Sequence, residues 1–220
     1  GTYPVVFDEE MMATLLETFA SVFYANSVHE GRSLLKGKMG QKVANELITI
    51  VDDALHPEGS SSRYFDSEGY PSQRTVLIEK GELKSYLHNT KTALKDKVKS
   101  TGNGSRSYKG SLGISPSNLI LEPGSNKVSD LLSKYDRIIE IVALQGMHAG
   151  ASTISGDFSL SAEGFLYENG KKQYSLRPFT VSGNFLDMLQ NVEMIADNFQ
   201  FNSSSIGASS VLIKELAISG

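Results

Sequence analysis

Phe165-Leu-Tyr-Glu-Asn169-Gly170-Lys-Lys-Gln-Tyr174 carries the strongest hairpin signal in the chain. Asn-Gly between two β-prone runs favours a two-residue turn, because both central residues of such a turn need a positive φ. Residues 75–87 repeat the pattern, with an apolar run, a turn at Gly81 and an alternating run. Residues 138–144 and 210–218 are further apolar runs that we interpret as strands.

Helical periodicity is confined to a few segments. Asp8 is placed to cap a helix over Met11–Tyr24 that Asn26 and Ser27 would end, and its apolar positions are Met11, Met12, Leu15, Leu16, Phe19 and Phe23. A second helix is expected from Ser125 or Asn126, and a third from Asn184 that could pass into a strand. The fold class is therefore α+β and β-dominated, with mixed sandwich or barrel-like sheets, hairpins and a few helices.

Composition excludes several classes of function. The chain has 220 residues, a net charge of −4 and no cysteine, so disulfides and thiolate metal sites are absent. An acidic chain does not carry the basic footprint of a nucleic-acid binder, and no apolar run approaches the roughly 18 residues of a membrane span. No composition break divides the chain, so residues 1–220 are expected to form one domain. The start at Gly1, without methionine, suggests the cut end of a longer protein.

Two short segments match catalytic motifs only in part. His29-Glu30 begins like the H-E-x-x-H zinc helix, but Ser33 and Leu34 stand where the second histidine would be, which favours an exposed loop pair. Ser33-Leu-Leu-Lys36 fits the S-x-x-K acylation motif, but no K-T-G follows. A serine hydrolase is therefore not expected.

Two pairs of acidic residues and a glycine-rich loop each have both a functional and a purely structural interpretation. Asp52-Asp53 and Asp66-Ser-Glu68 could serve acid–base chemistry or hold a hard cation, but Asp66–Pro71 has the composition of a turn. Thr101-Gly-Asn-Gly-Ser-Arg106 could form an anion-binding nest, although a flexible connection is the favoured interpretation.

The loop over residues 145–159 is the most distinctive segment between two predicted strands. It combines three glycines with a histidine and an aspartate, and irregular loops beside a rigid sheet often line sites. We therefore take His148, Gly150 and Asp157 as candidates for lining a cavity or a peptide-binding loop.

The ordered set of motifs resembles one family. Asp66-x-Glu68-Gly69-x-Pro71-x-Gln73-Arg74-Thr75, followed by Leu77-Ile78-Glu79-x-Gly81-x-Leu83, is similar to the FDxEGxxxQRTxLIExGxL signature of the TldD/PmbA proteins, once described as modulators of DNA gyrase. Thr101-Gly102-Asn103 resembles the family's TGN motif. Gly156-Asp157-Phe158-Ser159, Glu168-Asn169-Gly170 and Ser182-Gly183-Asn184 resemble its C-terminal GDFS, ENG and xGN series. The match runs from about Val5 to Gly220 and implies the C-terminal region of such a protein, without its N-terminal domain.

The resemblance also carries expectations about metal. TldD-like subunits hold zinc on a helix with H-E-x-x-x-H and a C-terminal cysteine, whereas PmbA-like (TldE) subunits lack these ligands and pair with TldD to form a peptidase. In this chain Leu16, Glu17 and Ser21 lie over the motif, no histidine occurs in that helix, and Phe199–Ala208 has no cysteine. The resemblance thus implies a PmbA-like chain with no cofactor of its own, and zinc in a TldD-like partner. Glu17 is expected to be a solvated helix residue rather than a general base.

Three functional hypotheses follow. The first is a non-catalytic subunit of a cytoplasmic, dimeric zinc metallopeptidase that processes or degrades extended peptides, with no membrane or nucleic-acid partner. The second is a homodimeric metal-dependent hydrolase, with Asp66, Glu68 and Asp157 gathering a metal. The third is a peptide- or protein-binding module without a peptidase partner. Whether the chain is itself an enzyme stays open at this point, as does its substrate.

Overall fold

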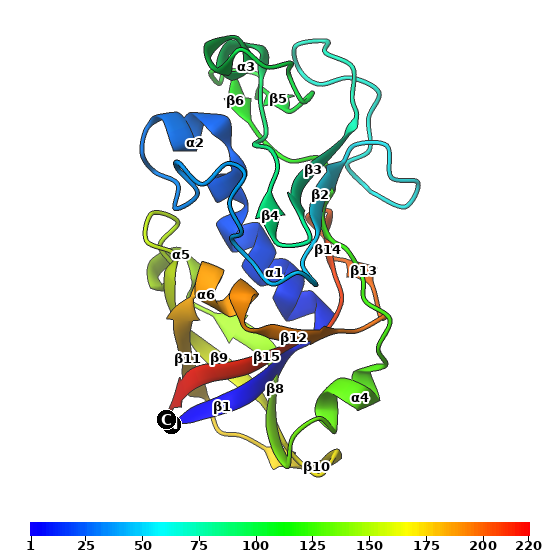
Figure 1. The fold of residues 1–220 in the computed structure, drawn as a ribbon, viewed down its shortest axis with the longest axis vertical. Coiled ribbons are helices and arrows are strands. Elements are labelled where there is room, and N and C mark those ends of the chain that lie inside the picture. Colours follow the sequence, from blue (N-terminus) through cyan, green and yellow to red (C-terminus); the bar gives the residue numbers. More distant parts are fainter.

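The computed structural model describes all 220 residues, and its lower half in Figure 1 is a closed five-stranded barrel. The order β1-β8-β9-β11-β15 closes because β15 also pairs with β1. Within this barrel only the pair β1 and β8 is parallel. The barrel strands are β1 (Thr2–Phe7), β8 (Arg137–Gln145), β9 (Asp157–Glu168), β11 (Phe179–Asn184) and β15 (Val211–Ser219). Strand β10 (Lys171–Ser175) extends the sheet beside β9, and β12 (Val192–Ile195) beside β15.

A second sheet of six short strands lies above the barrel (Figure 1). Its order is β13-β14-β7-β2-β3-β4, so segments far apart in the sequence meet in it. The bounds are β2 (Ile50–Asp53), β3 (Arg74–Glu79), β4 (Glu82–Leu83), β7 (Leu119–Leu121), β13 (Gln200–Phe201) and β14 (Ile206–Ala208). A small separate pair is formed by β5 (Gly104–Ser105) and β6 (Gly113–Ile114). The β-dominated α+β prediction with a barrel-like sheet is therefore confirmed.

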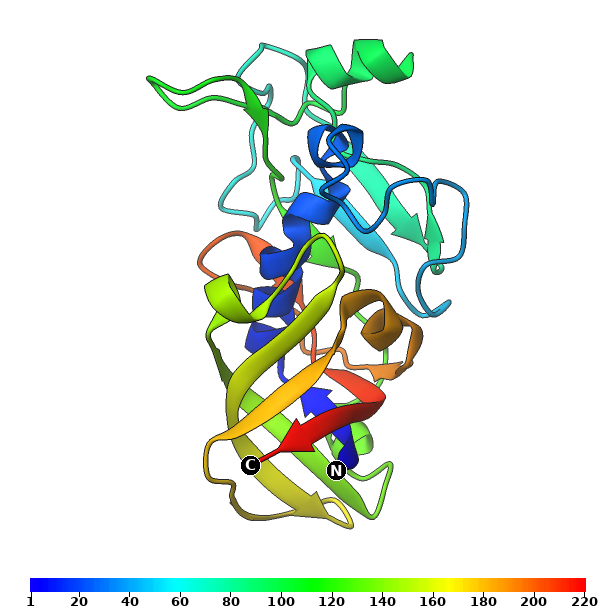
Figure 2. The ribbon, with the colours of Figure 1, turned by 90° about the vertical axis from the view of Figure 1, so that its left-hand side faces the viewer.

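Helix α1 (Glu9–Phe19) runs through the middle of the molecule, between the barrel and the second sheet (Figure 2). Asp8 caps it as predicted, because its side chain accepts a hydrogen bond from Met11 N at 2.7 Å. A 3-10 turn over Ala20–Phe23 and helix α2 (Ala25–His29) continue the chain. The prediction that Asn26 and Ser27 end the helix was wrong, since both lie within α2.

The remaining helices are short. Helix α4 (Val128–Leu132) begins two to three residues later than expected, and α6 (Phe185–Gln190), capped by Asn184, passes into β12 as predicted. Helix α5 (Met147–Gly150) lies in the loop between β8 and β9. Helix α3 (Thr90–Asp96) was not predicted, although Asn89 and Thr92 form a capping box at its start.

Both predicted hairpins are present, and each turns through two residues with positive φ. Asn169 and Gly170 have φ of 49° and 72°, and Lys80 and Gly81 have 47° and 82°. The return arm of the second hairpin is only the two-residue β4, so the predicted strand up to Leu87 was too long. None of the helices is long and apolar enough to cross a membrane.

One hydrophobic cluster of 43 buried residues extends through the barrel, α1 and the second sheet. At its centre the ring of Phe19 stacks on that of Phe185, with centroids 4.3 Å apart and an interplanar angle of 13°. Burying a side chain of this size is worth about 1.5–3 kcal/mol, so α1 is held on the side that carries Phe19. Its opposite side is left to line a surface groove.

Candidate functional site

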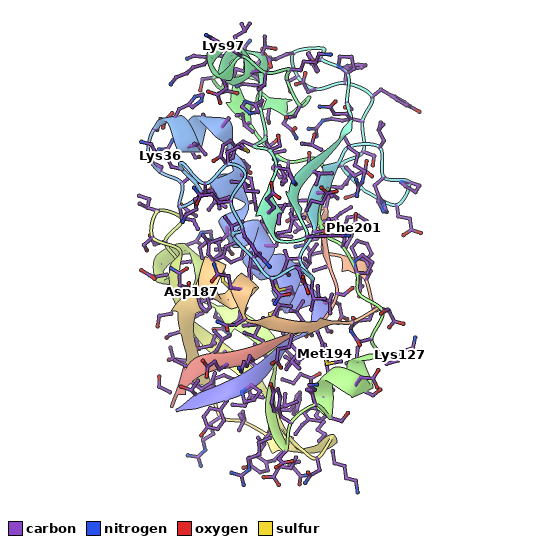
Figure 3. All side chains as sticks on the ribbon, viewed as in Figure 1. Lys36, Lys97, Lys127, Asp187, Met194 and Phe201 are labelled. Atoms are coloured by element: carbon purple, nitrogen blue, oxygen red, sulfur yellow. The ribbon has the colours of Figure 1, made fainter.

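The exposed side of α1 forms one wall of an acidic groove of about 400 Å³. Leu15, Leu16 and Phe19 are fully buried, which turns the positions of Glu10, Thr14 and Glu17 outward at helical spacing. The other wall is β13 and the residues that follow it, near the Phe201 label in Figure 3. The lining of the acidic groove is Asp8, Glu9, Glu10, Thr14, Glu17, Gln200, Phe201, Asn202 and Ser203.

Side-chain hydrogen bonds tie the two walls together. Asn202 Nδ2 donates to Glu17 Oε2 at 2.9 Å, while Asn202 Oδ1 accepts from the amides of Ser204 and Ile206. Asn198 Nδ2 and Ser210 Oγ both donate to Glu9 Oε2, at 2.7 and 3.1 Å. The chain before β13, after β13 and after β14 is therefore fixed against α1 by the amides of Asn198 and Asn202 and the hydroxyl of Ser210.

The groove has an excess of negative charge. No lysine, arginine or histidine forms an ion pair with Asp8, Glu9, Glu10 or Glu17. Burial, reinforced by the charges of Glu9, Glu10 and Glu140, raises the pKa of Asp8 to about 6 even though the Met11 amide opposes the shift. At neutral pH such a lining attracts cationic groups and repels anionic ones.

The donor set does not fit the zinc site of a metallopeptidase. Such sites use imidazole or thiolate ligands, with at most some carboxylates, and the groove offers carboxylates, amides and hydroxyls alone. No three histidine, aspartate or glutamate side chains anywhere in the chain are grouped to hold a metal ion. The side chains of Glu9 and Glu17 are moreover engaged with protein donors.

The three residues placed over the zinc motif have different surroundings. Leu16 is 0 % exposed and belongs to the hydrophobic core, so it does not face the groove. Glu17 is exposed, as expected, and it lines the groove. Ser21 lies half-buried in the 3-10 turn. Of the three residues, Glu17 alone therefore lines the groove.

The candidate loop residues His148, Gly150 and Asp157 are not part of the acidic groove. His148 is exposed on α5. Gly150 packs so closely that a Cβ there would lie 2.3 Å from Ser159 O. The pKa of Asp157 is lowered by hydrogen bonds from Asn184, at 3.0 Å, and from Ser155. The loop is linked to the upper half by Leu34 N, which donates to Thr153 O.

The three acids of the second hypothesis do not form one cluster, because Asp157 lies apart from Asp66 and Glu68. Asp66 forms the predicted turn, with Oδ1 accepting from Glu68 N and Tyr70 N and Oδ2 from Gly104 N. Glu68 accepts from Thr90 N at the start of α3. These two carboxylates lie in the upper half, whereas Asp157 begins β9 in the barrel (Figure 1). A metal centre built from all three was a wrong expectation, because Asp157 lies in the barrel and the carboxylates of Asp66 and Glu68 accept hydrogen bonds from backbone amides of the upper half.

The glycine-rich loop is a buried structural network rather than a flexible connection. Thr101 Oγ1 accepts a hydrogen bond from the His88 amide at 2.7 Å and donates one to Asn103 Oδ1. Asn103 Nδ2 in turn donates to Asp52 Oδ2 at 2.6 Å. Asp52 also accepts from Ser117 N and Oγ. Burial nevertheless raises the pKa of Asp52. The acidic group that this loop holds is thus the side chain of Asp52.

His29 and Ser33 have structural roles. His29 ends α2 and its Nε2 bonds Asp96 Oδ1 at 2.7 Å, so the expectation of an exposed loop pair was wrong for the histidine. Ser33 Oγ is buried and donates to Val22 O at 2.6 Å. The sequence resemblance had singled out Phe199–Ala208 as the segment without the family's cysteine, but it did not show that Gln200–Ser203 forms the second wall, whose position depends on long-range pairing. The one local signal was the spacing of Glu10, Thr14 and Glu17.

Comparison with known proteins identifies the chain's relatives. A family model described as the PmbA/TldA metallopeptidase C-terminal domain matches residues 1–220. The chain is 29% identical to the metalloprotease PmbA of Escherichia coli O157:H7 over 99% of the chain and 46% of that protein. It is 31% identical to the metalloprotease MJ0996 of Methanocaldococcus jannaschii over 94% of the chain and 46% of that protein. The chain spans about half the length of the curated relatives it matches.

Two solved structures share the fold over the whole chain. A proposed modulator of a DNA gyrase from Thermotoga maritima superposes with a TM-score of 0.94 at 40% identity, covering 100% of the chain and 50% of that structure. TldE from Thermococcus kodakarensis superposes with a TM-score of 0.92 at 28% identity, with the same coverage. The chain therefore belongs to the PmbA/TldD family, whose C-terminal domain its residues 1–220 match.

Proposed function

We propose that residues 1–220 act as the C-terminal domain of a PmbA/TldE-like, non-catalytic subunit in a cytoplasmic TldD-type zinc metallopeptidase complex. The partner subunit supplies the zinc and the bond-breaking chemistry. This chain completes a closed dimer and helps to admit extended peptides. The family match and the similarity to TldE support this assignment.

One observation carries the proposal: the acidic groove is lined by carboxylates of α1 and by the amides of Gln200 and Asn202 on its other wall, and α1 is the helix placed over the zinc motif by the sequence resemblance. The zinc ion of such a peptidase is held by imidazole or thiolate ligands. Leucine, serine or a hydrogen-bonded amide cannot take their place as a zinc ligand. A subunit with this lining contributes binding and enclosure rather than metal chemistry.

The groove has features that suit an extended peptide. Strand β13 ends the order of the second sheet, so its second edge has no neighbouring strand. An extended chain can pair with such an edge through its backbone, which gives affinity with little demand on side chains. The carboxylates of α1 then face the incoming peptide and favour lysine, arginine or an amino terminus.

The loop that carries His148, Gly150 and Asp157 remains our candidate for a second segment near the shared cavity. It lies at the barrel end of β8 and β9 and contacts the upper half through Thr153. An exposed imidazole and an exposed carboxylate on a loop of tightly packed backbone are available to a partner.

Co-expression with a TldD-like protein tests the proposal. We expect a stable complex with peptidase activity on unstructured peptides, and no activity from this chain alone. Firmly bound zinc on the isolated chain, together with chelator-sensitive peptidase activity, would instead support the stand-alone homodimeric hydrolase. Failure to form a complex or to change activity would favour a peptide- or protein-binding module.

A further inference from the structure

The upper end of the molecule, where α3 and the β5–β6 hairpin lie, is strongly basic (Figure 1). Residues 90–109 contain six lysine or arginine residues and one acid, in a chain whose net charge is −4. We call the exposed residues of 91–99 and 106–109 the basic tip. Its six cations are all exposed: Lys91, Lys95, Lys97, Lys99, Arg106 and Lys109. Figure 2 shows both chain ends at the opposite end of the long axis, so neither of them forms part of the basic tip.

The positive charge of the basic tip is not paired within the chain. None of its six cations forms an ion pair with a carboxylate. Asp96, the one acid in the segment, bonds His29 Nε2 at 2.7 Å instead. Glu68, beside the start of α3, accepts from the Thr90 amide at 2.8 Å. The basic tip therefore presents an excess of positive charge, which attracts an anionic surface.

Large apolar side chains are exposed among these charges. Leu94 is 74% exposed and Val98 is 52% exposed on the α3 side, and Tyr108 in the hairpin is 97% exposed. Apolar surface is stabilised when it leaves water, but a phosphate backbone or an acidic peptide chain offers mainly polar contacts. The interface of an anionic bilayer accepts both lysine side chains and aliphatic or aromatic ones. The composition of the basic tip therefore favours a lipid surface.

Lys97 occupies a backbone position that usually belongs to glycine. It ends α3 with a φ of 58°, a left-handed conformation in which a side chain is strained. The cap itself uses backbone groups, since Val98 N donates to Ala93 O and Lys97 N to Leu94 O. Figure 3 shows Lys97 at the upper extreme of the molecule. Glycine would suit this turn better than lysine, so the lysine side chain contributes charge at this end rather than stability.

We propose that the basic tip binds the surface of an anionic lipid bilayer, with its lysines at the head groups and Leu94, Val98 and Tyr108 at the head-group boundary. The helix and the hairpin lie at the same protruding end, which suits a flat surface (Figure 2). Such peripheral binding needs no helix that crosses the membrane. It adds a membrane partner to the first hypothesis, which expected none. The inference is independent of the proposed peptidase role, because the basic tip and the acidic groove share no residue.

Sedimentation with vesicles of phosphatidylcholine alone, or mixed in equal parts with phosphatidylglycerol, tests the proposal. We expect the mixed vesicles to bind at least about tenfold more tightly than neutral ones, because each lysine near an anionic surface contributes to binding. Binding should be lost in about 1 M salt, where the screening length falls to about 3 Å. Equal binding to both kinds of vesicle, or no binding to the mixed ones, would overturn the proposal.

Lys97→Gly is the key charge variant, since it removes a cation without disturbing the cap. We expect affinity for the mixed vesicles to fall about fivefold, the ratio that corresponds to about 1 kcal/mol per lysine. The thermal unfolding midpoint should stay unchanged or rise, because glycine adopts the left-handed conformation without strain. Lys134→Gln removes an exposed cation outside the basic tip and should leave binding unaltered. Equal losses in both variants would show general charge attraction and refute the proposal.

Leu94→Ser separates lipid from other anionic partners. We expect it to weaken binding to the mixed vesicles about tenfold, because a leucine side chain no longer enters the bilayer interface. Leu47→Ser is the matched control, since Leu47 is 48% exposed and lies outside the basic tip. Binding to duplex DNA that Lys97→Gly weakens and Leu94→Ser does not, with vesicle binding equally insensitive to Leu94→Ser, would assign the basic tip to a nucleic acid and refute the proposal. Loss of vesicle binding in a longer protein that contains this chain would mean that another segment covers the basic tip, and would also refute it.

Discussion

Asp8 offers a quantitative test of the acidic groove. Its carboxylate caps α1 through the Met11 amide, yet burial and neighbouring charges raise its pKa from an ordinary value near 4 to about 6. A shift of about two units corresponds to at most about 3 kcal/mol, at 1.36 kcal/mol per unit. Because the carboxylate is partly exposed, screening by solvent reduces the expected effect to about 1–2 kcal/mol.

The sign follows from proton linkage. A carboxyl whose pKa is higher in the folded state binds its proton more tightly there, so ionising Asp8 as pH rises through about 4 to 6 lowers the free energy of unfolding. Asp8→Asn keeps the capping oxygen and removes this charge. We expect the variant to match the parent near pH 4 and to exceed it by about 1–2 kcal/mol above pH 7.

Urea denaturation of the parent and Asp8→Asn between pH 4 and 8 measures the difference between their free energies of unfolding. The titrations of other groups affect both proteins equally and cancel in this difference. Asp8→Ala is the matched control, since it removes both the charge and the cap, which alone is worth about 1 kcal/mol. It should therefore fall below Asp8→Asn by that amount at every pH. A stability difference between Asp8→Asn and the parent that stays flat with pH, or that favours the parent above pH 7, would refute the reasoning.

Three further predictions concern the core network, the barrel and the groove. Asn103→Ala removes a donor from the buried carboxylate of Asp52 and should lower the free energy of unfolding by about 2–3 kcal/mol in urea denaturation. Gly164→Ala places a Cβ 1.9 Å from Glu140 O between β9 and β8, and should cost about 3 kcal/mol or more by the same measurement. Glu17→Gln, in the complex with a TldD-like partner, should lower kcat/KM for lysine-rich peptides by up to about fivefold and leave neutral peptides unaffected.

A specific outcome would contradict each of these three predictions. Gly113→Ala is the control for the barrel glycine, because a Cβ there meets nothing closer than 3.8 Å. Equal stability of the two glycine variants would contradict the packing between β8 and β9. An unchanged unfolding midpoint in Asn103→Ala would mean that Asp52 does not depend on this amide. A uniform loss for all peptides in Glu17→Gln would remove the charge-based role of the groove.

Local signals made much of the architecture predictable. The Asn169-Gly170 turn and the Gly81 turn fix their hairpins through short-range sterics, and Asp8 caps α1 through a neighbouring amide. The chain also contained a signal for α3, the Asn89 and Thr92 capping box, which the absence of an apolar stripe obscured. What local sequence does not specify is the pairing of distant strands, such as Thr2 with Ala217, which closes the barrel.

The candidate site illustrates the same limit. The outward position of Glu17 follows from burial of Leu15, Leu16 and Phe19, which helical periodicity indicates. Its partner Asn202 comes from a segment that reaches α1 only because β14 pairs with β7 and carries β13 at its side. Motif spacing therefore located the helix, whereas the acidic lining emerged from the tertiary structure.

Zinc stoichiometry in the complex tests the non-catalytic role most directly. The complex with a TldD-like subunit would be dialysed against trace zinc, and the metal would be counted per subunit pair by mass spectrometry. Because the groove offers carboxylates on α1 and amides and hydroxyls on its other wall, we expect one firmly bound zinc per pair, held by the partner. Two zinc ions per pair, one of them lost when Glu17 is replaced by alanine, would contradict it.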